Sequence, residues 1–333
     1  MQSPTQVDSD GAARELRFPR QLRIGSDRFA LPIIWVAMAV VFAILRPGTF
    51  ATTANLQTIF STQSVLVILA LAALLPLIVG EFDLSIAANM GLSAIVVATL
   101  NVNHGWPISL VVVAAIASGA MVGLINAVLI VGIGVDALVA TLGVSTLAAG
   151  LALAVSDYKT ISGIDQGLID AIGHRAWGMP LSFYYGLLLV VVMWLLLSHT
   201  AIGRHLYFVG RSREVARLSG LRVAGLRGGA FVAGGALAGL AGVVLTGTLG
   251  SADPAGGAPF LLPAYAAAFL GSTTIRPGFF NPVGTILAAY FLTTGVTGLQ
   301  LLGLEDWVQQ FFYGVALLFA VVLSKIAGRN NSR

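Results

Sequence analysis

Long apolar stretches recur along this chain, and its polar residues gather in the connections between them. Crossing ~30 Å of hydrocarbon takes about 20 helical residues, and most of the stretches approach that length. Lipid offers no hydrogen-bond partner to an open strand, so each stretch is expected to be an α-helix. Ten such segments are present, at residues 31–45, 64–79, 86–100, 108–133, 137–155, 181–197, 228–249, 259–270, 283–302 and 307–323.

The composition argues against a soluble protein of this size. Mean hydropathy is +0.91, and only 10% of the 333 residues are charged. A soluble domain could not cover so much Leu, Val and Ala with polar surface. The sequence therefore predicts an all-α, polytopic membrane helix bundle with about ten transmembrane helices in a domain spanning residues 29–324. Segment 259–270 is short for a span, and whether it crosses completely is open at this point.

The arginines indicate how the chain is oriented. Residues 1–28 carry five arginines, and basic residues concentrate on the cytoplasmic side of membrane proteins. With this tail inside, six crossings return residues 199–227, which carry six arginines, to the cytoplasm. Four more crossings place the tail 325–333 there, so that 15 of the 18 basic residues are cytoplasmic. We therefore predict that both termini and the basic connection 199–227 are cytoplasmic.

Several kinds of chemistry are not expected. A Walker A loop places a lysine directly after a glycine, whereas the two lysines of this chain follow Tyr158 and Ser324. The four histidines lack the helical pair spacing of a metal site, and the chain has no cysteine. We therefore expect neither ATP hydrolysis by this chain nor an enzyme activity, and no metal, cofactor or nucleic-acid partner.

A short helix is predicted inside the basic connection. Ser212 suits an N-cap, Glu214 suits the first turn, and Gly220 suits the left-handed stop. Val215 and Leu218 share one face, and two arginines four residues apart share another. Such a helix fits a groove on a soluble partner, although the arginines could instead serve topology and contact anionic lipid. The candidate coupling residues are Arg213, Glu214, Val215, Arg217, Leu218 and Gly220.

Polar residues inside the apolar segments are candidates for a transport path, because they seek partners or water rather than lipid. In three segments they repeat at helical spacing. For any single one of them we favour interhelical hydrogen bonding, but for the whole set we favour a hydrated path. Glycine pairs at 119 and 123 and at 235 and 239 predict close helix contacts. The candidate path residues are Asp83, Ser85, Asn89, Ser93, Asn126, Thr141, Ser145, Thr293, Thr297 and Gln300.

Asp83 is the acidic member of this set. A carboxylate at membrane depth is costly unless it is paired or hydrated. We favour a solvated break between two helices over a position at the cytoplasmic interface. An N-cap role for the helix that begins near Ser85 is compatible with both, and direct contact with a substrate is a further alternative.

Two motifs resemble permease subunits of bacterial carbohydrate ABC importers of the ribose, xylose, arabinose and galactose type. Residues 210–220, GRSREVARLSG, are similar to the coupling loop GGNxEAARLSG, with Arg211 and Ser212 in place of Gly and Asn. Residues 80–85, GEFDLS, are similar to GGxDLS, with Glu81 in place of a glycine. Weaker matches in the same order, among them 139–143, 270–273 and 307–310, extend the resemblance over about residues 55–323.

The resemblance implies a multi-pass subunit of the bacterial inner membrane that moves a sugar delivered by a periplasmic binding protein. ATP and Mg would be bound by separate ABC ATP-binding subunits that grip residues 199–227, and a second permease subunit, the same or related, would complete the pathway in the lipid bilayer. The external connection 156–180 would face the binding protein, or it is an ordinary solvated loop.

The sequence is also compatible with two other functions. A permease of the same superfamily could carry amino acids or nucleosides, but charged substrates favour buried counter-charges, and the polar stripes here are neutral. An ion-coupled secondary transporter would need acidic residues within several spans. The acidic residues found, Glu81, Asp83 and Asp136, all lie near span ends.

Overall fold

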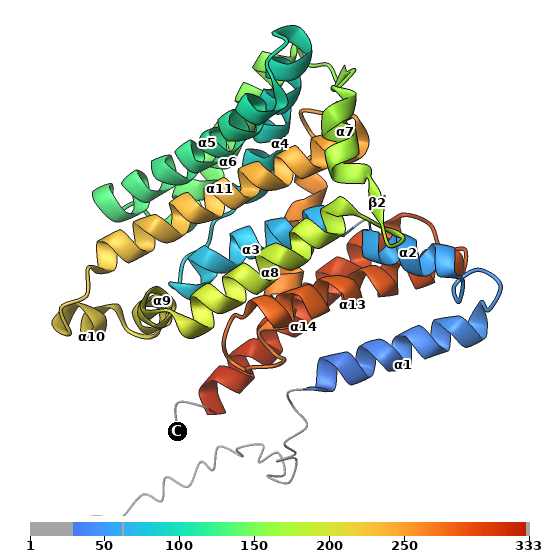
Figure 1. The fold of residues 1–333 in the computed structure, drawn as a ribbon. Coiled ribbons are helices and arrows are strands. Elements are labelled where there is room, and N and C mark those ends of the chain that lie inside the picture. The colour runs from blue at the N-terminus through green and yellow to red at the C-terminus, as the bar shows by residue number, and fades with distance from the viewer. Residues whose placement is uncertain (1–28, 62, 331–333) are drawn as a thin grey trace, which may run out of the picture.

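The computed structural model describes residues 29–61 and 63–330 and is mostly helical (Figure 1). The predicted tail 1–28 and residues 331–333 lie outside the described residues, and the last helix continues past the predicted boundary at 324. The α-helices are α1 (Ala30–Leu45), α2 (Thr53–Ser61), α3 (Ser64–Ile78), α4 (Ile86–Ala98), α5 (Ile108–Ala127), α6 (Ala137–Ser156), α7 (Gln166–Gly173), α8 (Leu181–His199), α9 (Ala201–Arg211), α10 (Arg213–Leu218), α11 (Val223–Leu249), α12 (Leu261–Gly271), α13 (Pro282–Leu301) and α14 (Trp307–Asn330).

Short irregular elements complete the bundle. The π-helical turns η2 (Thr99–Asn103) and η3 (Val128–Ile133) extend α4 and α5, and the 3₁₀ turn η4 (Ala258–Phe260) leads into α12. Strand β1 (Ile161–Ser162) pairs with β4 (Ser251–Ala252), and β2 (Arg175–Ala176) pairs with β3 (Met179–Pro180), both antiparallel.

The polytopic helix bundle predicted from the apolar segments is confirmed. Among the described residues, seven helical stretches are long and apolar enough to cross a membrane: α2–α3, α4–η2, α5–η3, α6, α8, α11 and α13. Three shorter apolar helices, α1, η4–α12 and α14 as far as Leu323, coincide with the other three predicted segments. A total of ten crossings stays a prediction.

The connections between the helices fall into two groups, one at each end of the bundle, and contacts within each group identify its members. At one end, Tyr207 of α9 donates its hydroxyl to the carbonyl of Phe280, between α12 and α13, at 2.6 Å. At the other, strand β1 follows α6 and pairs with β4, which follows α11. In Figure 1, α9, α10 and the end of α14 lie at the lower left, whereas α7 and β2 lie at the upper right. Segment η4–α12 therefore runs from the second group to the first.

Two features form the centre of the bundle. Every residue of α3 is buried, as expected of a helix that is apolar all round. Beside it, α5 and α11 meet along the predicted glycine pairs: a Cβ added at Gly119 would lie 2.8 Å from Cα of Gly239, and one added at Gly235 would lie 2.9 Å from the backbone nitrogen of Gly123. The close approach predicted from glycine spacing is confirmed.

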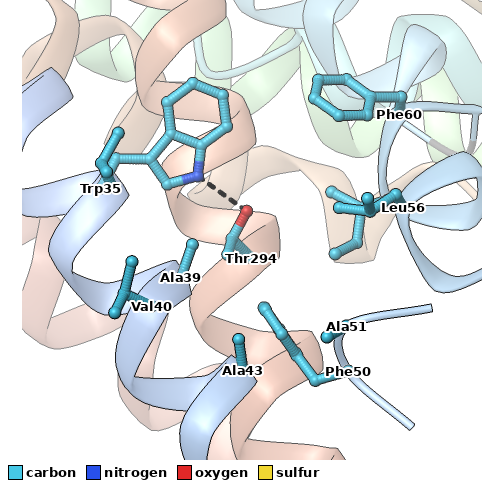
Figure 2. A pocket seen from close by; sticks show the side chains of 11 residues that line it. Trp35, Ala39, Val40, Ala43, Phe50, Ala51, Leu56, Phe60 and Thr294 are labelled. Carbon is cyan, nitrogen blue, oxygen red and sulfur yellow. Dashed lines mark hydrogen bonds between the residues drawn. The ribbon is translucent and has the colours of Figure 1, made fainter. Parts of the chain in front are cut away.

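Helix α1 is attached at the edge of the bundle. Its Trp35 donates from Nε1 to Oγ1 of Thr294 in α13 at 2.8 Å, and its Phe42 ring occupies the space beside Gly298. A cavity of about 400 Å³ lies between α1, α2 and α13, lined by apolar side chains apart from Thr294. Figure 2 shows the side chains that line it. This helix is held by a few side-chain contacts rather than by a continuous backbone seam.

Three short helices, α2, α7 and α9, were not predicted. Each lies in a stretch that the search for long apolar segments passes over. Capping signals do mark two of them. Asp165 accepts from the amide of Gly167 at 2.7 Å, and Thr200 accepts from that of Gly203 at 3.2 Å. The external connection is therefore partly helical, and the basic connection contains two helices instead of one.

Candidate functional site

The helix predicted in the basic connection is confirmed as α10. Ser212 is its N-cap, and the hydroxyl accepts from the amide of Val215 at 3.4 Å. Glu214 lies in the first turn, where the helix dipole favours a negative charge. Gly220 has a positive φ, the left-handed conformation expected of a glycine that ends a helix.

One face of α10 projects away from the bundle. Leu218 is 79% exposed and Val215 is 49% exposed, whereas Ala216 between them is fully buried. Glu214 and Arg217 are exposed beside the apolar pair. An apolar pair flanked by charges at the end of the molecule where the arginines gather is typical of a protein contact.

Helix α10 is tied to the connection between α3 and α4 by charge. Arg213 Nη2 lies 2.8 Å from Oε1 of Glu81 and donates to the carbonyl of Gly80 at 3.0 Å. Arg227, in the first turns of α11, donates from Nε to the same Glu81 oxygen at 2.9 Å. The two motifs recognised separately in the sequence are thus in contact. Sequence reasoning missed Glu81 as the partner, although a carboxylate replacing a glycine near an arginine-rich connection was a usable signal.

Asp83 lies in the predicted break between α3 and α4, but its side chain is buried. Oδ1 accepts from the amide and the hydroxyl of Ser85, at 3.0 and 2.5 Å, and from Nδ2 of Asn126 at 3.2 Å. The Tyr265 hydroxyl accepts from the Asp83 amide and donates to the Asp83 carbonyl. The N-cap interpretation was wrong, because Ser85 holds that position and Asp83 binds its amide in a local turn.

The polar stripe of α4 faces neighbouring helices. Asn89 donates from Nδ2 to the carbonyls of Gly119 in α5, at 3.1 Å, and Gly235 in α11, at 3.3 Å. Ser93 lies 3.2 Å from the hydroxyl of Ser118. In this conformation Asn89 and Ser93 bond to neighbouring helices, Asn89 through carbonyl oxygens that the glycines between α5 and α11 leave accessible. A role for either residue in a transport path stays a prediction.

The remaining stripes do not join this cluster. The hydroxyls of Thr141 in α6 and Thr293 in α13 donate to carbonyls four residues earlier in their own helices, at 2.7 and 3.0 Å. Thr297 is half-buried and Gln300 is exposed. The structure therefore brings Asp83, Ser85 and Asn126 together and leaves the α6 and α13 candidates apart from them. Helical spacing predicted a common face for each stripe but not a common cavity.

A cavity lies beside Ser145, one of the candidate path residues. The cavity, of about 250 Å³, lies between α4, α6 and the segment that leads into α12. Small residues such as Ala87, Gly91, Ala149 and Gly257 supply most of its wall, so backbone lies close to the space. No charged side chain is among its lining residues.

Outside the spans, burial and ion pairing shift the pKa of Tyr207 and Asp157. Burial raises the pKa of Tyr207 to about 12, so that its hydroxyl stays a neutral donor to Phe280 at physiological pH. In the external connection, the hydrogen bond from Lys159 lowers the pKa of Asp157 and keeps it ionised. Within the described residues, no group of three or more His, Asp or Glu side chains is arranged to hold a metal ion.

Comparison with known proteins matches nearly the whole bundle. The family model described as "Branched-chain amino acid transport system / permease component" matches residues 55–321. The D-allose transport system permease protein AlsC of Escherichia coli (strain K12) is 27% identical, over 98% of this chain and 99% of that protein. The autoinducer 2 import system permease proteins LsrC of Salmonella choleraesuis (strain SC-B67) and LsrD of Photorhabdus luminescens are 30% and 33% identical, over 90% and 77% of this chain and 86% and 78% of theirs. No solved structure matches.

Proposed function

This chain belongs to the permease-component family of the branched-chain amino acid transport systems, and on that premise we propose that it is the membrane-spanning subunit of an ATP-binding cassette importer for a sugar. The observation that carries the proposal is α10, a capped helix that exposes Val215 and Leu218 beyond the bundle. A transport subunit without a Walker loop must receive energy by contact, and α10 offers a surface for that contact.

The relatives favour a sugar as substrate. AlsC is named for D-allose, a hexose, and it matches this chain from end to end. The cavity beside Ser145 has no charged side chain among its lining residues, which favours a neutral molecule over a charged one. An amino acid or other charged substrate would favour buried counter-charges. The amino-acid alternative therefore ranks below the sugar, and the name of AlsC favours a sugar over a nucleoside.

The membrane arrangement we propose has ten crossings in the bacterial inner membrane and both termini in the cytoplasm. Support comes from the alternation of connections between the two ends of the bundle: the connections after α3, α8 and α12 meet at the α9–α10 end, and those after α6 and α11 meet at the β1–β4 pair. The arginine-rich connection lies at the first end, in keeping with the positive-inside rule.

The partners follow from this arrangement. Two ATP-binding subunits, which hold ATP and Mg, would seat α10 and its equivalent in a second permease subunit. A periplasmic sugar-binding protein would dock at the end that carries α7 and the exposed Asp157–Lys159 pair, where surface charges steer encounter. Closure of the ATP-binding subunits would then alternate access to the sugar between the two sides.

Reconstitution with an ATP-binding subunit and a sugar-binding protein in proteoliposomes tests the proposal. We expect ATP-dependent sugar uptake by the complete assembly. Leu218→Asp should weaken binding of the ATP-binding subunit by about 10- to 100-fold, because it places a charge in an apolar contact, and membrane insertion should be unchanged. Leu304→Asp is the matched control, since Leu304 is exposed in the connection between α13 and α14 at the opposite end.

The outcomes separate the alternatives. Uptake that needs no ATP-binding subunit would favour an ion-coupled transporter. Equal binding by Leu218→Asp, Leu304→Asp and the unchanged chain would mean that the arginines serve topology and lipid contact alone. Loss of insertion in Leu218→Asp alone would assign α10 a role in folding instead.

A further inference from the structure

Glu81 is a buried carboxylate shared by two arginines. Its side chain is 7% exposed, and the single oxygen Oε1 contacts both Arg213 and Arg227. Removing one partner from a buried ion pair leaves a charge without compensation, which is strongly unfavourable. Glu81 therefore fixes the position of whichever arginine stays with it, and of the helix that carries that arginine.

The two arginines differ in how firmly they are held. The Arg227 side chain is 18% exposed and contacts Glu81 through both Nε and Nη2. The Arg213 side chain is 46% exposed and contacts Glu81 through Nη2, which also donates to Gly80. Water or a partner protein can reach the Arg213 contact, whereas the Arg227 contact is largely enclosed. Glu81 is thus held by an enclosed contact to Arg227 of α11 and by a solvent-accessible, exchangeable contact to Arg213 of α10.

Glu81 is also two residues from the polar cluster at Asp83. The backbone amide and carbonyl of Asp83 are both held by the Tyr265 hydroxyl of α12, and its carboxylate is held by Asn126 of α5. Oδ1 of Asn126 is buried without a hydrogen-bond partner among the described residues. Such an atom costs free energy, so this conformation leaves the cluster incompletely satisfied. A shift at Glu81 would reach α5 and α12 through these bonds.

We propose that Glu81 is the positioning residue that transmits movement of α10 to the break between α3 and α4, by exchanging the Arg213 contact while it keeps the Arg227 contact. The inference rests on the proposed function, because movement of α10 is taken to follow from the ATP-binding subunit. It assigns a role to a side chain at a position where the importers that this chain resembles usually have glycine. In this chain the link between α10 and the break is made through an acidic side chain as well as through the backbone.

The test uses the assembled complex in proteoliposomes, with sugar uptake and ATP hydrolysis measured with and without the sugar-loaded binding protein. Glu81→Gln and Arg213→Gln should each reduce stimulation of hydrolysis and uptake by about tenfold, while hydrolysis without the binding protein continues. Arg213→Lys, which keeps the charge, should retain most of the stimulation. Arg46→Gln, at an exposed arginine between α1 and α2, should behave as the unchanged chain.

A double-mutant cycle shows whether the two residues act through one contact. Combining Glu81→Gln with Arg213→Gln should be no worse than the more severe single variant. Combining Glu81→Gln with Arg217→Gln should multiply the two effects, because Arg217 is exposed on α10 and acts at the partner surface. Multiplied effects for the Glu81 and Arg213 pair, or normal stimulation in both single variants, would overturn the proposal.

Two further comparisons distinguish a loss of folding from a loss of transmission. If Glu81→Gln fails to assemble, the comparison of Arg213→Gln with Arg213→Lys decides: loss with Gln and retention with Lys supports transmission, and equal behaviour overturns it. The unchanged complex tests the premise. Without ATP-dependent uptake by the unchanged chain the proposed function fails, whereas normal uptake with unaffected variants removes the role of Glu81 alone.

Discussion

Two contacts hold helices together in opposite ways. One is the seam, where α5 and α11 meet at Gly119, Gly123, Gly235 and Gly239. The other is the pair of ionic contacts from Arg213 and Arg227 to Glu81, beneath α10. The seam brings backbone against backbone at four glycines, with no room for a Cβ at any of them. The contact beneath α10 depends on arginine side chains that reach one carboxylate, and one of those arginines is half exposed. Packed backbone separates only if the helices come apart, whereas a half-exposed ion pair can exchange with water at little cost.

This difference indicates where the molecule can move. The α4–α5–α11 unit, sealed by the seam and by Asn89 across it, is expected to move as one body. Movement is expected to enter at α10, a helix of six residues with one buried side chain, Ala216. Rigid units joined at exchangeable contacts are the arrangement on which alternating access depends.

Breaking the seam should have the largest effect. Gly235→Leu places side-chain atoms against the backbone of Gly123, 2.9 Å from its nitrogen at the Cβ alone, and against the carbonyl of Gly119. We expect a loss of about 3 kcal/mol or more in the free energy of unfolding, seen as little or no monodisperse protein after detergent extraction.

The matched control is Gly229→Leu, on the same helix, where an added Cβ meets no atom within 4 Å. It should be extracted in normal amounts. Equal yields of Gly235→Leu and Gly229→Leu would mean that the seam can open, and the contrast with the α10 contact would disappear.

A smaller effect is expected from Asn89, whose side chain bonds to both helices of the seam. Asn89→Ala removes the two hydrogen bonds to the carbonyls of Gly119 and Gly235, each worth ~0.6 kcal/mol in a membrane bundle. It also removes Oδ1, a buried atom without a partner among the described residues, so the net loss should be about 1 kcal/mol. Thermal unfolding in detergent measures it, with Asn103→Ala, an exposed amide at the end of η2, as control.

The outcome for Asn89→Ala also separates packing from transport. A modest drop in stability with normal sugar uptake fits an interhelical bond. Normal stability with abolished uptake would support the path interpretation that the sequence favoured and would mean that the two hydrogen bonds add little to stability.

Sequence patterns predicted the helices because each pattern rests on a local or solvent-driven rule. Lipid makes a long apolar run helical, and capping residues such as Ser212 and Gly220 delimit α10 without reference to the rest of the chain. Glycine spacing predicted the seam for a similar reason, since a row without side chains has little other use on a helix face.

The partners of polar side chains could not be predicted in the same way. Spacing placed Ser85, Asn89 and Ser93 on one face of α4, and the structure turns all three toward protein. Which carbonyl or carboxylate each one meets depends on how α5 and α11 cross, and that information is tertiary. The same holds for Glu81, whose arginine partners lie far along the chain, on α10 and α11.

The smallest effect is expected at a second contact near α10. Tyr207→Phe removes the hydroxyl of α9 that donates to Phe280, which should cost about 0.5 kcal/mol at neutral pH without impairing uptake. Because burial raises the pKa of Tyr207 to about 12, the folded protein favours the neutral phenol, and its stabilising contribution is lost as pH rises from about 10 to 12. The difference in unfolding temperature between the unchanged chain and the variant should therefore shrink across that window. A difference that stays constant would mean that the hydroxyl contributes through packing, and that this end of the bundle is held more like the seam than like the exchangeable contact at Glu81.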